Sequence, residues 1–227
     1  EILAIHKRAI WEIPEGLEYE EAAVMDPICN AYKAIAQRSG LLPGENVVIF
    51  GTGPLGLFSV QIAKIMGALN IVVVGLEEDV KVRFGVAKQL GATEVVNGSA
   101  EDVVKRCQEI CGGSDSIGLV VDCAGANICL KQAIEMVRCN GEIVRVGMGF
   151  KPVGFSINDI SMKAVSIIGH MAYDATSWRN SLHLLAAGRI QVKPMITHRL
   201  GLSRWEEGFE AMANKEAIKV ILTYDFD

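Results

Sequence analysis

Three glycines at fixed spacing, in the run Gly51-Thr52-Gly53-Pro54-Leu55-Gly56, mark the part of the sequence whose chemistry is clearest. The run follows a short β-branched segment, 46–50, and opens a stretch with apolar residues at helical spacing. In a strand–turn–helix setting the first glycine permits a tight turn, the second lets a phosphate approach the backbone, and the third lets helix and strand pack closely. The helix N-terminus offers unpaired N–H groups to an anion. These six residues predict the pyrophosphate site of a dinucleotide; the alternative is a turn that needs glycine only for its shape.

The acidic residue that normally accompanies such a turn is missing from its usual place. An Asp or Glu at the end of the second strand binds the ribose 2′-hydroxyl of NAD, but this position holds Gly75. A neutral residue removes the repulsion of the 2′-phosphate of NADP, whereas the acidic run 77–79 opposes a phosphate. Either Glu77 reaches back to the 2′-hydroxyl of NAD, or Lys81 and Arg83 bind the phosphate of NADP; we favour NAD.

That acidic run also has a plain structural interpretation. Acidic side chains are stabilised at a helix N-terminus by the helix dipole. Residues 77–79 stand directly before a segment with helical spacing. A solvated helix start therefore explains them as well as a role in cofactor binding does.

Strand-like and helix-like segments alternate around the glycine turn. We expect strands at 46–50, 70–74, 94–97, 117–123, 141–146 and 165–169, and helices at 55–66, 79–90, 101–111, 128–137 and 177–188. Nearly continuous apolar strands separated by helices predict a parallel sheet that is covered on both faces. The predicted fold class is therefore α/β, a doubly wound sheet with its ligand crevice at the carboxyl ends of the strands.

Two flanking segments fall outside this alternation. The opening contains an irregular proline-containing stretch and a helical segment expected at 18–38. Beyond Pro194 we expect a strand at 196–200, a helix from Ser203 to Asn214 with Ser203 as its N-cap, and a strand at 217–223. We interpret both segments as edges of a second domain whose main body is not in this sequence.

The composition favours a small-molecule partner. Among 227 residues, 22 are Lys or Arg and 27 are Asp or Glu, which leaves a net charge of −5 and gives no sign of nucleic-acid binding. No apolar run is long enough to span a bilayer, and there is no signal peptide. The six cysteines form neither a CxxC pair nor a disulfide framework, which predicts reduced thiols in a cytoplasmic protein.

Several strings resemble, in their order and spacing, one known superfamily. Besides the glycine turn, they are Ala22–Pro27, Ala63–Ala68, Ala87–Ala92, Val121–Gly125, Val144–Met148 and Ile196–Arg199. Together they resemble the medium-chain dehydrogenase/reductase superfamily, in its zinc-dependent sorbitol, threonine and alcohol dehydrogenase branch. The resemblance implies a Rossmann-type NAD(P)-binding domain over 29–194. It would lie between two parts of a GroES-like catalytic domain, with 1–28 as the remnant of one part and 195–227 as the return to it.

The resemblance also implies an activity and a set of contacts. The full-length protein would transfer a hydride between a secondary alcohol or polyol and NAD or NADP, with Zn²⁺ polarising the substrate oxygen. The adenosine would lie near Gly75 and Glu77, and the nicotinamide carboxamide near Ala124, Val146 and Met148. The main zinc ligands lie upstream in the family, so the catalytic residues stay unknown and the fragment alone is expected to be inactive.

Asp26 matches a family glutamate that precedes a proline and ligates the metal or holds its water. Aspartate is one methylene shorter, so ligation and a water-mediated role beside the ligands are equally open, as is a plain helix N-cap before Pro27. Two other functions compete: a zinc-independent NADPH quinone or alkene reductase of the same superfamily, against which Asp26 argues, and a non-catalytic dinucleotide-binding module. The resemblance further implies a homo-oligomer formed through an edge strand of the sheet.

Overall fold

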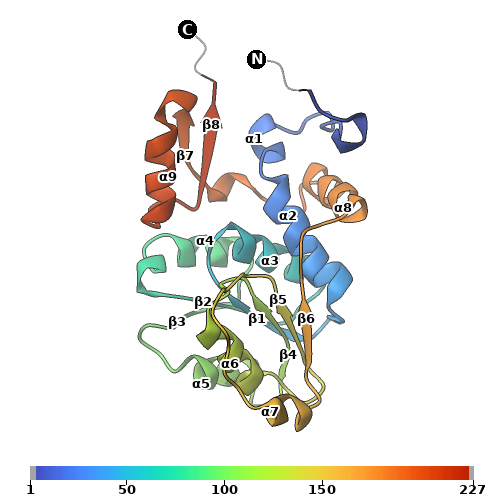
Figure 1. Cartoon of the computed structure of the whole chain (residues 1–227), viewed down its shortest axis with the longest axis vertical. Coiled ribbons are helices and arrows are strands. Elements are labelled where there is room, and N and C mark those ends of the chain that lie inside the picture. Colours follow the sequence, from blue (N-terminus) through green and yellow to red (C-terminus); the bar gives the residue numbers. More distant parts are fainter. Residues whose placement is uncertain (1–3, 225–227) are drawn as a thin grey trace.

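The computed structural model describes residues 4–224; the outer ends of the two flanking segments, 1–3 and 225–227, lie outside the described residues. The chain forms two regions (Figure 1). One is a six-stranded sheet with helices on both faces, and the other lies beyond one end of that sheet and contains the start of the chain and the C-terminal segment.

The large sheet is entirely parallel. Its strands are β1 (Asn46–Phe50), β2 (Ile71–Gly75), β3 (Glu94–Asn97), β4 (Ile117–Asp122), β5 (Glu142–Arg145) and β6 (Ser166–Gly169). They lie in the order β3-β2-β1-β4-β5-β6, and β1 pairs with both β2 and β4. The predicted doubly wound sheet is confirmed, with each strand within two residues of its predicted bounds. The order reverses between β1 and β4, so a crevice is expected above their carboxyl ends.

Two apolar clusters cover the two faces of the sheet. Successive side chains of a strand point to opposite faces, so Val47 and Ile49 join one cluster while Val48 and Phe50 join the other. The first cluster contains side chains of the helices α2 (Met25–Tyr32), α3 (Pro54–Ile65), α4 (Arg83–Leu90) and α8 (Ala175–Ala186). The second contains side chains of α5 (Val103–Cys111) and α6 (Asn127–Met136). Both faces of the central strands β1, β2 and β4 are therefore buried, whereas the edge strand β6 is largely exposed.

Two predicted helical segments are divided in the structure, and one further helix was not predicted. The segment 18–38 divides into α1 (Tyr19–Ala22), α2 and a π-helical continuation, Lys33–Arg38. The segment 79–90 begins with a separate 3-10 turn, Glu77–Asp79, because the Asp79 carboxylate accepts a hydrogen bond from the Leu76 backbone at 2.8 Å and closes a local turn. A short helix that the sequence analysis did not predict, α7 (Ile157–Ser161), starts at Ser156, whose hydroxyl caps it.

The C-terminal segment forms a second, smaller sheet. Strands β7 (Ile196–Gly201) and β8 (Lys219–Thr223) pair in parallel, and α9 (Trp205–Ala213) lies against them. The predicted N-cap was wrong: Arg204 occupies that position, after a 3-10 turn, Leu202–Arg204. The Arg204 side chain makes no capping hydrogen bond; its guanidinium pairs with Glu207 at 2.7 Å across the first turn. No helix among residues 4–224 is long and apolar enough to cross a membrane.

Candidate functional site

The glycine turn joins β1 to α3. Each of its three positions accommodates glycine for a different structural reason. Gly51 adopts φ +103°, a left-handed conformation that side chains rarely adopt. A Cβ on Gly56 would lie 2.0 Å from the Gly51 carbonyl oxygen, so only glycine lets α3 begin this close to the strand. Gly53 has φ −72°, and a Cβ there would meet no atom of the chain within 4 Å. The fold requires the first and third glycines, whereas the open space above Gly53 is room for a ligand.

A cavity of about 370 Å³ opens at this turn. Its walls come from the carboxyl ends of β1, β2 and β4 and from the start of α6, where doubly wound sheets bind their ligands. Of the residues predicted to bind the cofactor, five line this cavity: Gly51, Thr52, Gly53, Gly75 and Ala124. Pro54, Leu55 and Gly56 form the first turn of α3 directly behind it. The backbone donors of the turn, the N-terminus of α3 and the cavity beside them therefore fit a dinucleotide.

A larger hollow of about 560 Å³ lies elsewhere, between α6 and α7. It is lined by Lys131, Phe155, Met162 and their neighbours, and no residue of the glycine turn reaches it. Because it has neither converging strand ends nor backbone donors from a glycine turn, we assign the site to the smaller cavity.

Two cysteines line the smaller cavity, Cys123 and Cys129. Burial raises the pKa of Cys123 to about 12 and that of Cys129 to about 11. Both therefore remain protonated thiols at neutral pH, and a thiol is a poor nucleophile compared with a thiolate. Their role in the cavity is packing.

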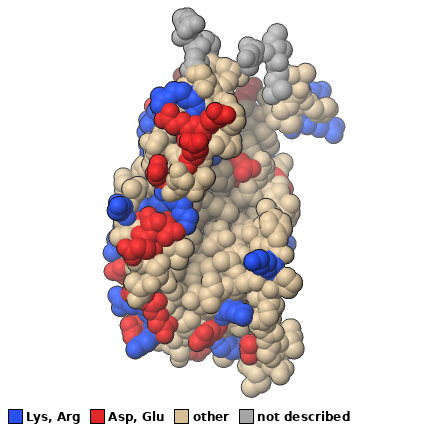
Figure 2. Space-filling view, turned by 60° about the vertical axis from the view of Figure 1, so that its left-hand side comes forward, with Lys and Arg blue, Asp and Glu red and all other residues tan. Residues whose placement is uncertain are grey.

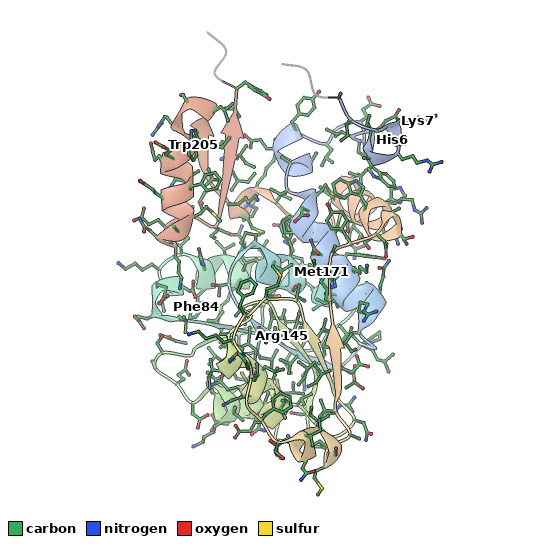
Figure 3. The ribbon with its side chains drawn as sticks, viewed as in Figure 1. His6, Lys7, Phe84, Arg145, Met171 and Trp205 are labelled. Atoms are coloured by element: carbon green, nitrogen blue, oxygen red, sulfur yellow. The ribbon has the colours of Figure 1, made fainter. Side chains whose placement is uncertain are left out.

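The loops after β4 and β5 are joined by one buried ion pair. Asp122 is fully buried at the end of β4, and its carboxylate contacts the Arg145 guanidinium at the end of β5 at 2.5 Å. Figure 3 labels Arg145. The same carboxylate accepts hydrogen bonds from the backbone of Ala124 at 3.0 Å and Gly125 at 2.8 Å, and Arg145 donates to the Gly125 carbonyl at 2.7 Å. Burial raises the pKa of Asp122, while these hydrogen bonds and Arg145 oppose the rise.

These contacts place the remaining residues predicted near the nicotinamide. The Val146 backbone donates to the Asp122 carbonyl at 2.9 Å, which holds the β5 loop beside the β4 loop. Met148 is 73% exposed and does not line the cavity, although its carbonyl would lie 2.5 Å from a Cβ on Gly125. The ion pair was not identified in the sequence analysis. The sequence signal for this pair was a charged residue at the end of each strand, Asp122 in β4 and Arg145 in β5.

The end of β2 explains the missing acidic residue. A Cβ on Gly75 would lie 2.5 Å from the Phe84 ring, 2.7 Å from the Thr52 methyl group and 2.9 Å from the Asp79 carboxylate, so the space that a side chain would need is occupied. Glu77 does not line the cavity; its carboxylate accepts a hydrogen bond from the Asn97 side chain at 2.6 Å. Asp79, which the sequence analysis did not single out, does line it.

Asp26 lies in the first turn of α2, away from any cluster of metal ligands. Its backbone carbonyl accepts a hydrogen bond from the Asn30 side chain at 3.0 Å, and its carboxylate interacts with Tyr173. Burial and then the Asp26 charge raise the pKa of Tyr173. Residues 4–224 contain no group of three or more His, Cys, Asp or Glu side chains able to hold a metal ion. The described residues therefore do not fit a zinc site on their own, and no chemical step is assigned to zinc through them.

Charge is distributed in both signs over the face drawn in Figure 2. Acidic and basic side chains alternate along its left side, and the middle of the face carries few charged groups. This face shows no continuous basic area of the kind that binds a nucleic-acid backbone.

A doubly wound parallel sheet whose glycine turn opens into a cavity at the reversal of strand order defines a Rossmann-type dinucleotide-binding domain. Comparison with known families gives the particular class: the family described as zinc-binding dehydrogenase matches residues 54–187. The chain belongs to this family.

Two relatives and one solved structure illustrate the similarity. The chain is 73% identical over 227 residues to an uncharacterized zinc-type alcohol dehydrogenase-like protein, YdjL, of Escherichia coli (strain K12), covering 100% of this chain and 63% of the relative. It is 33% identical over 218 residues to a sorbitol dehydrogenase of Gallus gallus, covering 95% of this chain and 59% of that protein. It resembles alcohol dehydrogenase TADH from Thermus sp. ATN1 with a TM-score of 0.86 and 30% identity, covering 93% of this chain and 62% of the other. The chain thus spans about three fifths of the proteins it matches.

Proposed function

We propose that this protein is an oxidoreductase that transfers a hydride between a secondary alcohol or polyol and a nicotinamide dinucleotide. The observation that carries the proposal is the open space above Gly53, at the N-terminus of α3, because the fold itself does not require glycine there. The similarity to alcohol and sorbitol dehydrogenases supports the substrate class.

The residues of this chain would bind and orient the cofactor. When bound, the nicotinamide ring accepts the hydride from the carbon that bears the alcohol. The first turn of α3 would hold the pyrophosphate through its free N–H groups. The Ala124 and Val146 loops, fixed to each other by Asp122 and Arg145, would support the nicotinamide end.

We further propose that zinc assistance belongs to the longer protein. Residues 29–194 would form the cofactor domain, and 1–28 and 195–227 the edges of a catalytic domain that supplies the metal ligands. Asp26 is the side chain of this chain that we assign to the metal's surroundings. Because residues 4–224 hold no ligand cluster of their own, the 227-residue chain would bind the cofactor without turning over alcohol. We place the protein in the cytoplasm on the basis of its six free thiols.

A homo-oligomer is proposed from the edge of the large sheet. Strand β6 pairs with β5 on one side, and within residues 4–224 no strand covers its other side. Ile167 is 36% exposed there. An uncovered edge strand offers backbone groups that pair readily with a second copy. Light scattering of the purified protein would give the mass of a dimer or tetramer if this edge is used, and that of a monomer otherwise.

The decisive experiment combines binding with turnover. NADH is titrated into the 227-residue chain by calorimetry, and the longer protein is assayed on secondary alcohols and polyols with its zinc content measured in parallel. Binding by the chain, together with zinc-dependent turnover by the longer protein, supports the proposal. Turnover without zinc would indicate the reductase alternative, binding without turnover would indicate a cofactor-binding module, and no binding would contradict the proposal.

A further inference from the structure

The adenosine end of the cavity contains a carboxylate that comes from an unusual position in the fold. Asp79 stands four residues beyond the end of β2, yet its Oδ2 lies 2.9 Å from where a Cβ of Gly75 would be. The side chain is 5% exposed and lines the cavity together with Gly51 and Thr52. The Asp79 carboxylate therefore lies close to where the side chain of an acidic residue at position 75 would lie.

The turn 77–79 holds this carboxylate in place. Its Oδ2 accepts the Leu76 backbone N–H at 2.8 Å, and its Oδ1 faces the Arg83 guanidinium at 3.3 Å. Arg83 in turn donates to the Ala217 carbonyl at 2.8 Å, which ties the turn to the start of β8. Each carboxylate oxygen can accept a second hydrogen bond, so Asp79 retains capacity for a hydroxyl in the cavity.

The other charged groups near this end of the cavity have partners. Glu77 accepts from Asn97, and Glu78 pairs with Lys215, which itself lines the cavity. Arg83 also lines the cavity, but its guanidinium already pairs with Asp79 at 3.3 Å and donates to the Ala217 carbonyl at 2.8 Å, while its Nε is buried without a partner. A 2′-phosphate would meet the Asp79 charge and would have to displace Glu78 from Lys215. A 2′-hydroxyl needs only an acceptor.

We propose that Asp79 accepts a hydrogen bond from the adenosine ribose 2′-hydroxyl and so selects NAD over NADP, in place of the acidic residue missing at Gly75. This inference rests on the proposed dinucleotide function and names the side chain that discriminates between the two cofactors. Glu77 and Lys81 do not line the cavity, and Arg83, which does, would hold the Asp79 carboxylate rather than bind a 2′-phosphate.

The test compares NADH with NADPH binding to the whole chain by calorimetry. The wild-type chain should bind NADH at least about 100-fold more tightly than NADPH, because the phosphate loses the acceptor and meets a like charge. Asp79→Asn removes the negative charge but keeps a side-chain acceptor oxygen, so NADH binding should weaken by about tenfold, the difference between a charged and a neutral hydrogen bond, and the preference should be reduced. Glu77→Gln is the matched control: it removes the same charge two residues away and should leave both affinities unchanged.

A second variant keeps the proposal testable if Asp79→Asn fails to fold. Lys215→Ala removes the cation that a 2′-phosphate would use, so NADPH binding should stay as weak as in the wild type; a further fall would show that the wild type already binds the phosphate there and would overturn the inference. NADPH binding as tight as NADH binding, or a preference that is lost in Glu77→Gln but kept in a folded Asp79→Asn, would overturn the inference while leaving the dinucleotide function intact. Failure of both cofactors to bind would overturn both.

Discussion

Asp122 and Arg145 form an ion pair at 2.5 Å that joins the carboxyl ends of two neighbouring strands, next to Cys123 and Ala124 in the wall of the cavity at the glycine turn. The pair does more than neutralise charge. Asp122 also receives the Ala124 and Gly125 backbone N–H groups, and Arg145 reaches the Gly125 carbonyl. Because Gly125 and Gly147 leave no room for a Cβ against the opposite loop, the two loops behave as one unit.

Replacing Arg145 by methionine should destabilise the protein strongly. The substitution leaves the Asp122 carboxylate buried without its cation, and breaking a buried pair from one side costs about 3–5 kcal/mol of the free energy of unfolding. Urea unfolding at neutral pH measures the loss. Arg106→Met is the control, because Arg106 is exposed and pairs with Glu101 and Glu109 on the surface, where such pairs contribute about 0–1 kcal/mol.

The pH dependence of this loss has a definite sign. Burial already raises the pKa of Asp122 in the folded state, so the stability that protonation of this group provides is lost as the pH rises through that pKa. Removing Arg145 raises the pKa of Asp122 further. The deficit of Arg145→Met should therefore shrink as the pH falls below neutrality, and a deficit that stays constant down to the acid transition would contradict the assigned burial of Asp122.

The strands of the large sheet could be predicted from the sequence, whereas the contacts that position Asp79 and Arg83 in the candidate site could not. The run Asn46–Phe50 could be predicted as a strand from its own residues, because a short β-branched run that is followed by glycines is typical of a buried strand. The place of Asp79 depends on a turn that folds back over Gly75, and Arg83 is held by a carbonyl 134 residues away. Contacts of this kind arise from tertiary packing between distant parts of the chain, and a local sequence pattern does not predict them.

Enlarging Gly75 should destabilise the protein through crowding rather than through backbone strain. Its methyl group would press on the Phe84 ring at 2.5 Å, and overpacking of this kind costs about 1–3 kcal/mol. Thermal unfolding of Gly75→Ala should show this loss. In the double variant with Phe84→Leu the two effects should be less than additive, because the smaller side chain yields space. Strict additivity would show that Phe84 is not the obstacle.

We expect a second pH effect on the free energy of unfolding, from His170. Burial, followed by the charges of Lys33 and Arg38, lowers the pKa of His170, whose Nε2 lies 3.1 Å from the Asn30 side-chain oxygen. A lowered folded pKa means that the stability contributed by the neutral ring is present above the ordinary value of 6.5 and is lost as the pH falls through the folded pKa. The free energy of unfolding should fall more steeply between pH 7.5 and 5 in the wild type than in His170→Gln, as measured by urea titration. Equal slopes would contradict the prediction.

Gly53 and Gly56 separate ligand binding from folding within a single turn. In Gly53→Ala the new methyl group meets no atom of the chain, so stability should change by less than about 1 kcal/mol, the small gain from a stiffer unfolded chain being offset by a poorer N-cap. The same methyl group would stand where a pyrophosphate approaches α3, and NADH affinity should fall by at least about tenfold, since one displaced hydrogen bond to a charged group costs that much.

In Gly56→Ala the methyl group would lie 2.0 Å from the Gly51 carbonyl oxygen, so the free energy of unfolding should fall by about 1–3 kcal/mol or more. Thermal unfolding and NADH calorimetry on both variants distinguish the two roles. A Gly53→Ala protein that binds NADH as the wild type does would show that the turn is architectural.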